Sequence, residues 1–102
     1  MSKPREDLQT LLEELLESPN VYYQTPPSMG LKYTAIKYKK SRFDIKHAND
    51  IKYAGMTCYE LIVIAKQPDH PVIQKLMELP YCSYDRHYVA DNLNHDALTL
   101  YW

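Results

Sequence analysis

Glycine is scarce in this chain of 102 residues, which has only Gly30 and Gly55. Loops that hold phosphate groups need several glycines close together, because the backbone must approach the phosphate without side chains in the way. The sequence therefore excludes a glycine-rich phosphate loop. It also lacks a run of about 18 apolar residues, the length needed to span a bilayer as a helix, so we expect no membrane-spanning segment.

Cysteine and net charge are also low. Cys58 and Cys82 are far apart in a chain with no apolar signal segment at its start, so we expect two free thiols and synthesis in a reducing cytoplasm. Twelve basic and thirteen acidic residues leave a net charge of -1. Such a balance argues against nonspecific binding to nucleic acid or to an acidic membrane.

Tyrosine, in contrast, is abundant, with ten tyrosines against one phenylalanine. Tyrosine suits half-buried strands and protein interfaces, because its ring covers apolar surface while its hydroxyl stays hydrated. The length is enough for one domain with a modest core.

Hydrophobic periodicity predicts two helices and five strands. The helices are expected at 2–18 and 68–80, and the strands at 20–25, 31–40, 56–67, 81–90 and 95–102. The order α-β-β-β-α-β-β is typical of the α+β class. We predict a single domain over residues 1–102, with a mostly antiparallel sheet of four to five strands and both helices on one face.

Each helix has an expected boundary and an expected buried face. Leucines at helical spacing in residues 8–16 predict one buried stripe, and Pro19 predicts the end of the first helix. In the second helix we expect Asp69 as the N-cap. Its inward residues are expected to be Val72, Ile73, Leu76 and Met77.

The terminal strand is expected to pair with residues 81–90 through the turn DNLN, whose residues tolerate left-handed backbone. Leu98 and Leu100 should then join the core. The segment 41–55, SRFDIKHANDIKYAG, is polar and longer than most connections. We expect it to protrude as an arm or long hairpin, to be mobile in the free protein and to order against a neighbour.

Three groups of residues could carry chemistry. Asp85, His87, Asp91, His95 and Asp96 have metal-ligand side chains, and Asp85 and His87 should share a strand face, yet their spacing matches no known metal signature. Turn formation accounts for Asp91 and Asp96, and a turn or interface position for His95. Cys82 and His87 should lie on opposite faces of their strand, which argues against a thiol enzyme. We therefore expect no catalytic residues, no metal and no cofactor.

A lysine- and tyrosine-rich segment at 32–46 could bind nucleic acid instead, because it interleaves positive charge with aromatic rings. The residues concerned are Lys32, Tyr33, Lys37, Tyr38, Lys39, Lys40, Arg42, Phe43 and Lys46. The other interpretation is a solvated edge strand whose lysines discourage wrong pairing.

Three stretches of the sequence stand together as a distinctive pattern: NVYYQTPPSMGLKYTAIKYKKS, CYELIVIAKQPDHPVIQKLMELPYCSYDRHY and ADNLNHDALTLYW. Through them, nearly the whole chain resembles the small tail-completion proteins of long-tailed bacteriophages. The resemblance implies a tail terminator, also described as a neck or head-tail joining protein. Such a protein assembles from an α+β sheet domain into a hexameric ring, ends the growth of the tail tube and presents a surface to the head connector.

The expected partners are further copies of the chain, the tail tube protein and the connector proteins, without a membrane or a specific nucleic acid, although the genome passes through such a ring. The chain would be made in the host cytoplasm and reside in the virion. Expected interface residues are Tyr38, Arg42, Phe43, Tyr53, Tyr101 and Trp102. Alternatives are a head-completion or connector protein of the same neck, a nucleic-acid-binding module, and a metal-dependent enzyme built on His87 and His95.

Overall fold

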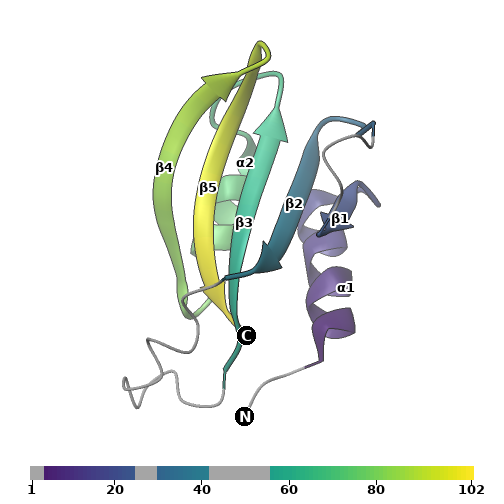
Figure 1. Cartoon of the computed structure of the whole chain (residues 1–102), viewed down its shortest axis with the longest axis vertical. Coiled ribbons are helices and arrows are strands. Elements are labelled where there is room, and N and C mark those ends of the chain that lie inside the picture. Colours follow the sequence, from purple (N-terminus) through teal and green to yellow (C-terminus); the bar gives the residue numbers. More distant parts are fainter. Residues whose placement is uncertain (1–3, 25–29, 42–55) are drawn as a thin grey trace.

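The chain folds in the order α-β-β-β-α-β-β, as the sequence pattern predicts, and forms one small α+β domain (Figure 1). The computed structural model describes residues 4–24, 30–41 and 56–102. The helices are α1 (Arg5–Leu16) and α2 (Pro71–Met77). The strands are β1 (Val21–Tyr23), β2 (Ala35–Lys40), β3 (Cys58–Ala65), β4 (Cys82–Ala90) and β5 (Leu93–Tyr101).

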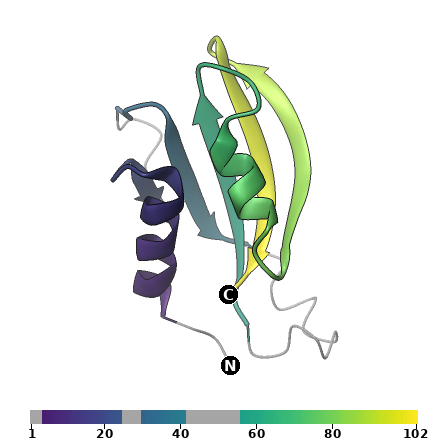
Figure 2. The same cartoon turned by 180° about the vertical axis from the view of Figure 1, so that it is seen from behind.

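The five strands form one mixed sheet in the order β1-β2-β3-β5-β4. Only the pair β1 and β2 is parallel, and the other neighbours are antiparallel. Both helices cover the same face of the sheet, α1 over the β1 and β2 side and α2 over β3, β5 and β4 (Figure 2). The described residues therefore form two layers, and neither described helix lies on the opposite face of the sheet, which is called the helix-free face below.

The C-terminal strand lies inside the sheet and not at its edge. β4 and β5 form a hairpin whose two turn residues, Asp91 and Asn92, both have left-handed backbone, with φ values of 53° and 62°. A turn of this kind matches the natural twist of the two strands. β5 then pairs with β3 from Cys58 to Ala65, so hydrogen bonds hold it on both sides.

The core fills the space between the two helices and the sheet. Side chains on the helix-facing side of β2, β3 and β5 meet the inward stripes of α1 and α2. The buried members are Leu8, Leu12, Leu16, Val21, Ile36, Tyr38, Tyr59, Leu61, Val63, Val72, Ile73, Leu76, Leu98 and Leu100. Leu98 and Leu100 thus join the core, as the alternation of β5 predicts.

Tyr38 belongs to this core and does not lie on the surface, which corrects the expectation that it is an interface residue. Only 2% of it is exposed. Its ring packs against those of Tyr23 and Tyr59, with centroid distances of 4.9 Å and 5.8 Å. Its hydroxyl donates to Gln9 Oε1 at 2.6 Å and accepts from Arg5 Nη1 at 3.0 Å. These two partners on α1 satisfy the phenol, so the residue ties helix to sheet.

Two expectations for α2 are wrong. The N-cap is His70, whose Nδ1 accepts a hydrogen bond from the Val72 N–H at 3.1 Å, whereas Asp69 precedes it with left-handed backbone at φ 56°. Met77, the last residue of the helix, is 46% exposed. The helix has only seven residues, and its buried residues are Val72, Ile73 and Leu76.

A β-bulge in β4 changes which side chains share a face. Pairing with β5 shifts between Tyr84 and Arg86, so Asp85 is an extra residue in the strand. Beyond the bulge, His87 pairs with Asp96 on the helix-covered side of the sheet. Cys82 lies on the same side, because it pairs with the core residue Leu100. The expectation that Cys82 and His87 lie on opposite faces is therefore wrong, and so is the expectation that Asp85 and His87 share one.

Candidate functional site

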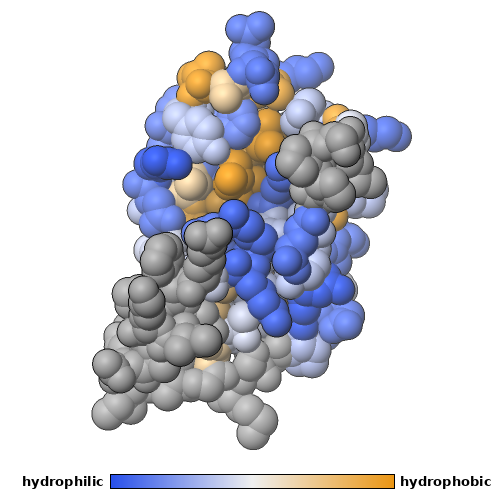
Figure 3. Space-filling model, in the orientation of Figure 1, coloured by the Kyte–Doolittle hydropathy of each residue, from blue (hydrophilic) through white to orange (hydrophobic). Residues whose placement is uncertain are grey.

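The helix-free face of the sheet carries apolar residues at its centre. Ile62 on β3 lies between Lys37 on β2 and Ala97 on β5, and both Ile62 and Ala97 are partly exposed. In Figure 3, which looks onto this face, a hydrophobic band lies in the upper centre with hydrophilic residues beside it. The exposed face of an antiparallel sheet normally alternates to polar residues, so this band is unusual for a face that meets only water.

Polar and aromatic side chains border this hydrophobic band. Lys39 and Glu60 form an ion pair at 3.7 Å, and Thr99 Oγ1 donates to Asp85 Oδ2 at 2.7 Å. Across β4 and β5, the rings of Tyr88 and His95 stack at a centroid distance of 4.8 Å, with an interplanar angle of 20°. Arg86 Cζ also lies over the Tyr88 ring, at 5.1 Å from its centroid. The resulting arrangement is an apolar centre with a partly charged rim, which is typical of protein interfaces.

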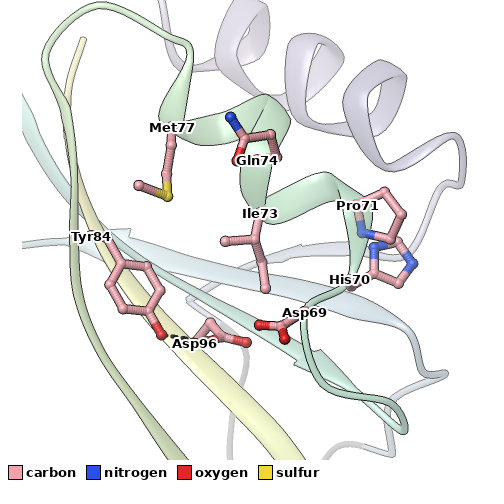
Figure 4. A pocket seen from close by; sticks show the side chains of 8 residues that line it. All are labelled: Asp69, His70, Pro71, Ile73, Gln74, Met77, Tyr84 and Asp96. Carbon is pink, nitrogen blue, oxygen red and sulfur yellow. Dashed lines mark hydrogen bonds between the residues drawn. The ribbon is translucent and has the colours of Figure 1, made fainter.

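A pocket of about 530 Å³ lies on the other side of the sheet, between α2 and the strands β4 and β5 (Figure 4). Its most buried polar member is Asp96, which is 5% exposed and accepts a hydrogen bond of 2.6 Å from the Tyr84 hydroxyl. This hydrogen bond, together with burial, raises the pKa of Tyr84 to about 12, because the neutral phenol is needed as the donor. Tyr84 therefore stays protonated at neutral pH.

Two of the expected interface residues lie at the end of β5. Tyr101 pairs with Cys58 on the helix-free side of the sheet and is half-buried. Trp102 packs against the core, and its Nε1 donates to the carbonyl oxygen of Pro4 at 3.0 Å. Two backbone hydrogen bonds with Thr57, of 2.8 Å and 3.0 Å, hold the same residue. The contacts of Trp102 thus hold the end of β5 within its own domain. Tyr101 lies on the same face as the hydrophobic band.

The remaining expected interface residues, Arg42, Phe43 and Tyr53, lie outside the described residues, as does the segment 42–55 of the expected arm. Of that segment only Ser41 is described, and its N–H donates to the carbonyl oxygen of Cys58 at 2.9 Å.

The five acidic and histidine residues near the C-terminus do not form one cluster, although His87 and Asp96 are paired across β4 and β5. Asp91 lies in the hairpin turn, and His95 stacks on Tyr88 on the helix-free face. His87 is on the opposite face, where its Nε2 is 3.0 Å from Asn94 Oδ1. Asp96 is a buried strand residue, so its expected role as a turn former is wrong. Since the sheet separates His87 from His95, the enzyme alternative built on that pair lacks its geometry.

The lysine- and tyrosine-rich segment is likewise divided by the alternation of β2. Lys37 and Lys39 lie on the helix-free face, whereas Tyr38 is buried beneath α1. A base cannot stack on the Tyr38 ring in the folded chain. This separation weakens the nucleic-acid interpretation for the described part of the segment, because stacking and positive charge must act on the same strand of nucleic acid.

The two cysteines do not form a disulfide. Cys58 is buried, and burial raises the pKa of the Cys82 thiol to about 11, with Asp85 adding to the effect. A thiol with such a high pKa is protonated at neutral pH and is a poor nucleophile.

Sequence reasoning missed Tyr84 and the pocket that it lines with Asp96 and α2, and it assigned Asp96 to a turn. The alternation of β5 does place Asp96 on the same face as Leu98 and Leu100, which could have indicated a buried carboxylate. Its partner could not have been found in this way, because the bulge at Asp85 changes the facing of β4.

Comparisons with protein families, with curated proteins and with solved structures find no match to this chain. Within the described ranges, no three residues of histidine, cysteine, aspartate or glutamate are placed to hold a metal ion. Neither described helix is long and apolar enough to cross a membrane.

Proposed function

We propose that this chain is a structural protein of a bacteriophage tail, a tail terminator that assembles into a hexameric ring at the end of the tail tube and meets the head connector there. The resemblance of its sequence to tail-completion proteins supplies the biological setting. The observation that supports self-assembly is the hydrophobic band around Ile62 and Ala97 on the helix-free face. Burying these residues against a neighbour removes apolar surface from water.

The sheet edges are less suited to this contact than the face. β4 is an edge strand of nine residues, but its bulge at Asp85 and the charges of Asp85 and Arg86 discourage pairing with another strand. A ring needs a heterologous contact, in which two different surfaces of the same chain meet. Tyr81 and Val89 lie at the two ends of β4 and are exposed. They offer two separate apolar contact points for the neighbouring copy, one at each end of the strand.

Mass measurement of suitable variants tests the assembly step. Ile62→Lys places a charge in the hydrophobic band, and Gln67→Lys adds the same charge at an exposed position outside the sheet. By native mass spectrometry and light scattering, alone and with tail tubes, the parent and Gln67→Lys should form one closed oligomer, whereas Ile62→Lys should stay monomeric with an unchanged circular dichroism spectrum. Tyr101→Ala should weaken assembly by about 1–2 kcal/mol. Normal assembly of Ile62→Lys would contradict the proposed interface.

Electron microscopy tests the location. Antibody against the chain should label the junction of head and tail in complete particles, and the free end in isolated tails. Label along the tail, on the head, or absent from particles would contradict a tail terminator.

A further inference from the structure

The pocket between α2 and the β4–β5 hairpin is lined both by carboxylate groups, one of them the buried Asp96, and by apolar side chains. Its members come from three elements and from the segment before α2: Asp69, His70, Pro71, Ile73, Gln74, Met77, Tyr84 and Asp96. Figure 4 shows the carboxylate groups of Asp69 and Asp96 on the same side of the pocket, below Ile73, with the Tyr84 ring beside them and Met77 above. The pocket is on the helix-covered side of the sheet and is thus separate from the hydrophobic band.

Asp96 lacks a positively charged partner among the described residues. It is 5% exposed, and its hydrogen bond comes from the neutral Tyr84 hydroxyl. The ion pairs of the described chain are Lys39 with Glu60 and Lys75 with Glu17, both elsewhere. A buried carboxylate that is hydrogen-bonded but not charge-paired favours a cation from outside, because burial without a counter-charge is unfavourable.

The second carboxylate at the pocket is that of Asp69, an exposed residue in the segment before α2. Asp69 has a left-handed φ of 56° and directly precedes the N-cap, His70. The Nδ1 atom of His70 accepts the Val72 N–H, and no ion pair joins His70 to Asp69 among the described residues. The pocket therefore has two carboxylates, and neither lysine nor arginine is among its described lining residues.

We propose that this pocket binds the guanidinium group of an arginine side chain that another polypeptide presents. A guanidinium is planar, can take hydrogen bonds to carboxylates with two N–H groups, and stacks on aromatic rings such as Tyr84. Its aliphatic arm would lie along Ile73 and Met77. A metal ion is a poorer fit, because no three acidic, histidine or cysteine side chains of the described residues, His70 included, are placed to hold one.

Titration with a blocked arginine tests the proposal on the intact chain, with backbone amide NMR signals as the readout. N-acetyl-arginine methylamide should shift the signals of Ile73, Tyr84 and Asp96. N-acetyl-citrulline methylamide has nearly the same shape without the charge, and should bind at least tenfold more weakly. Equal binding of the two compounds, or shifts confined to other parts of the chain, would overturn the proposal.

Three variants and one further probe sharpen the result. Asp96→Asn should weaken the binding of blocked arginine at least tenfold, whereas Asp85→Asn, an exposed carboxylate outside the pocket, should leave it unchanged. If Asp96→Asn does not fold, Met77→Lys places a competing cation at an exposed wall position and should weaken binding similarly. Equal effects of the pocket variant and Asp85→Asn would overturn the site. Ethylguanidine that binds as tightly as blocked arginine would overturn the polypeptide source in favour of a free alkylguanidine.

This inference does not depend on ring assembly. Arginine binding by a monomeric chain would support the pocket while contradicting the proposed ring, and a ring without arginine binding would do the reverse.

Discussion

Replacement of Leu100 by alanine should strongly destabilise the fold, although Leu100 is only two positions from the last residue of the sequence. Leu100 is 1% exposed and belongs to the buried cluster between the helices and the sheet. In the sheet, Leu100 pairs with Tyr59 of β3 on one side and with Cys82 of β4 on the other. Truncation to alanine leaves a cavity that these neighbours, fixed in two strands, can fill only in part.

The expected loss follows from this burial. Leucine-to-alanine changes in well-packed cores lower the free energy of unfolding by about 2–5 kcal/mol, and we expect about 3 kcal/mol here. A domain of this length has about 5–15 kcal/mol of stability in total, so the variant should lose a large share of it. With a urea dependence of about 1–3 kcal/mol per molar, the unfolding midpoint should fall by about 1–3 M.

Urea unfolding followed by circular dichroism and by the fluorescence of Trp102, the single tryptophan, measures the loss. The matched control is Leu93→Ala, which removes the same atoms from the first residue of β5, where the side chain is partly exposed. It should cost about 1 kcal/mol or less. A loss below about 1 kcal/mol for Leu100→Ala, or equal losses for the two variants, would refute the packing of the C-terminal strand into the core.

Two further predictions concern single hydrogen bonds. Because the pKa of Tyr84 is raised to about 12, above its unfolded value of about 10, the neutral phenol contributes stability that is complete below pH 10 and is lost as the pH rises from about 10 to about 12. The difference in stability between parent and Tyr84→Phe, measured by urea unfolding, should therefore shrink over that pH range, and a constant difference would contradict the Asp96 contact. His70→Ala should lower the free energy of unfolding by about 1 kcal/mol, because it removes the acceptor for the Val72 N–H. His70→Ser restores a capping oxygen and should stay close to the parent. Equal losses for the two variants would argue against the cap.

The extent of sequence-based prediction differs between local and tertiary features. The two helices and the five strands follow from patterns within short segments, and the structure confirms them. The hairpin turn is shorter than the predicted DNLN, because Leu93 and Asn94 already belong to β5. The cap of α2 was misplaced by one residue because aspartate is the commoner capping residue, while His70 also has an acceptor atom in reach of the Val72 N–H. Met77 was placed inside because helical spacing alone does not show where a short helix leaves the sheet.

The facing of β4 shows why the candidate site was harder to predict. Strict alternation puts Asp85 and His87 together, but one extra residue at the bulge reverses the alternation after it. The same bulge leaves Tyr84 and His87 on the side of Asp96. No spacing in the sequence marks such an insertion, because it depends on the register with the neighbouring strand.

The sequence by itself determined the order of the elements, the leucine stripe of α1, the apolar β3 and the left-handed turn at Asp91 and Asn92, because each depends on side chains a few residues apart. Only the tertiary structure decided that β5 lies between β3 and β4, that Tyr38 is buried against α1, and that α2 forms a pocket with the hairpin. These features depend on contacts between segments remote in the chain, where the strand register and the packing of all layers together select the arrangement.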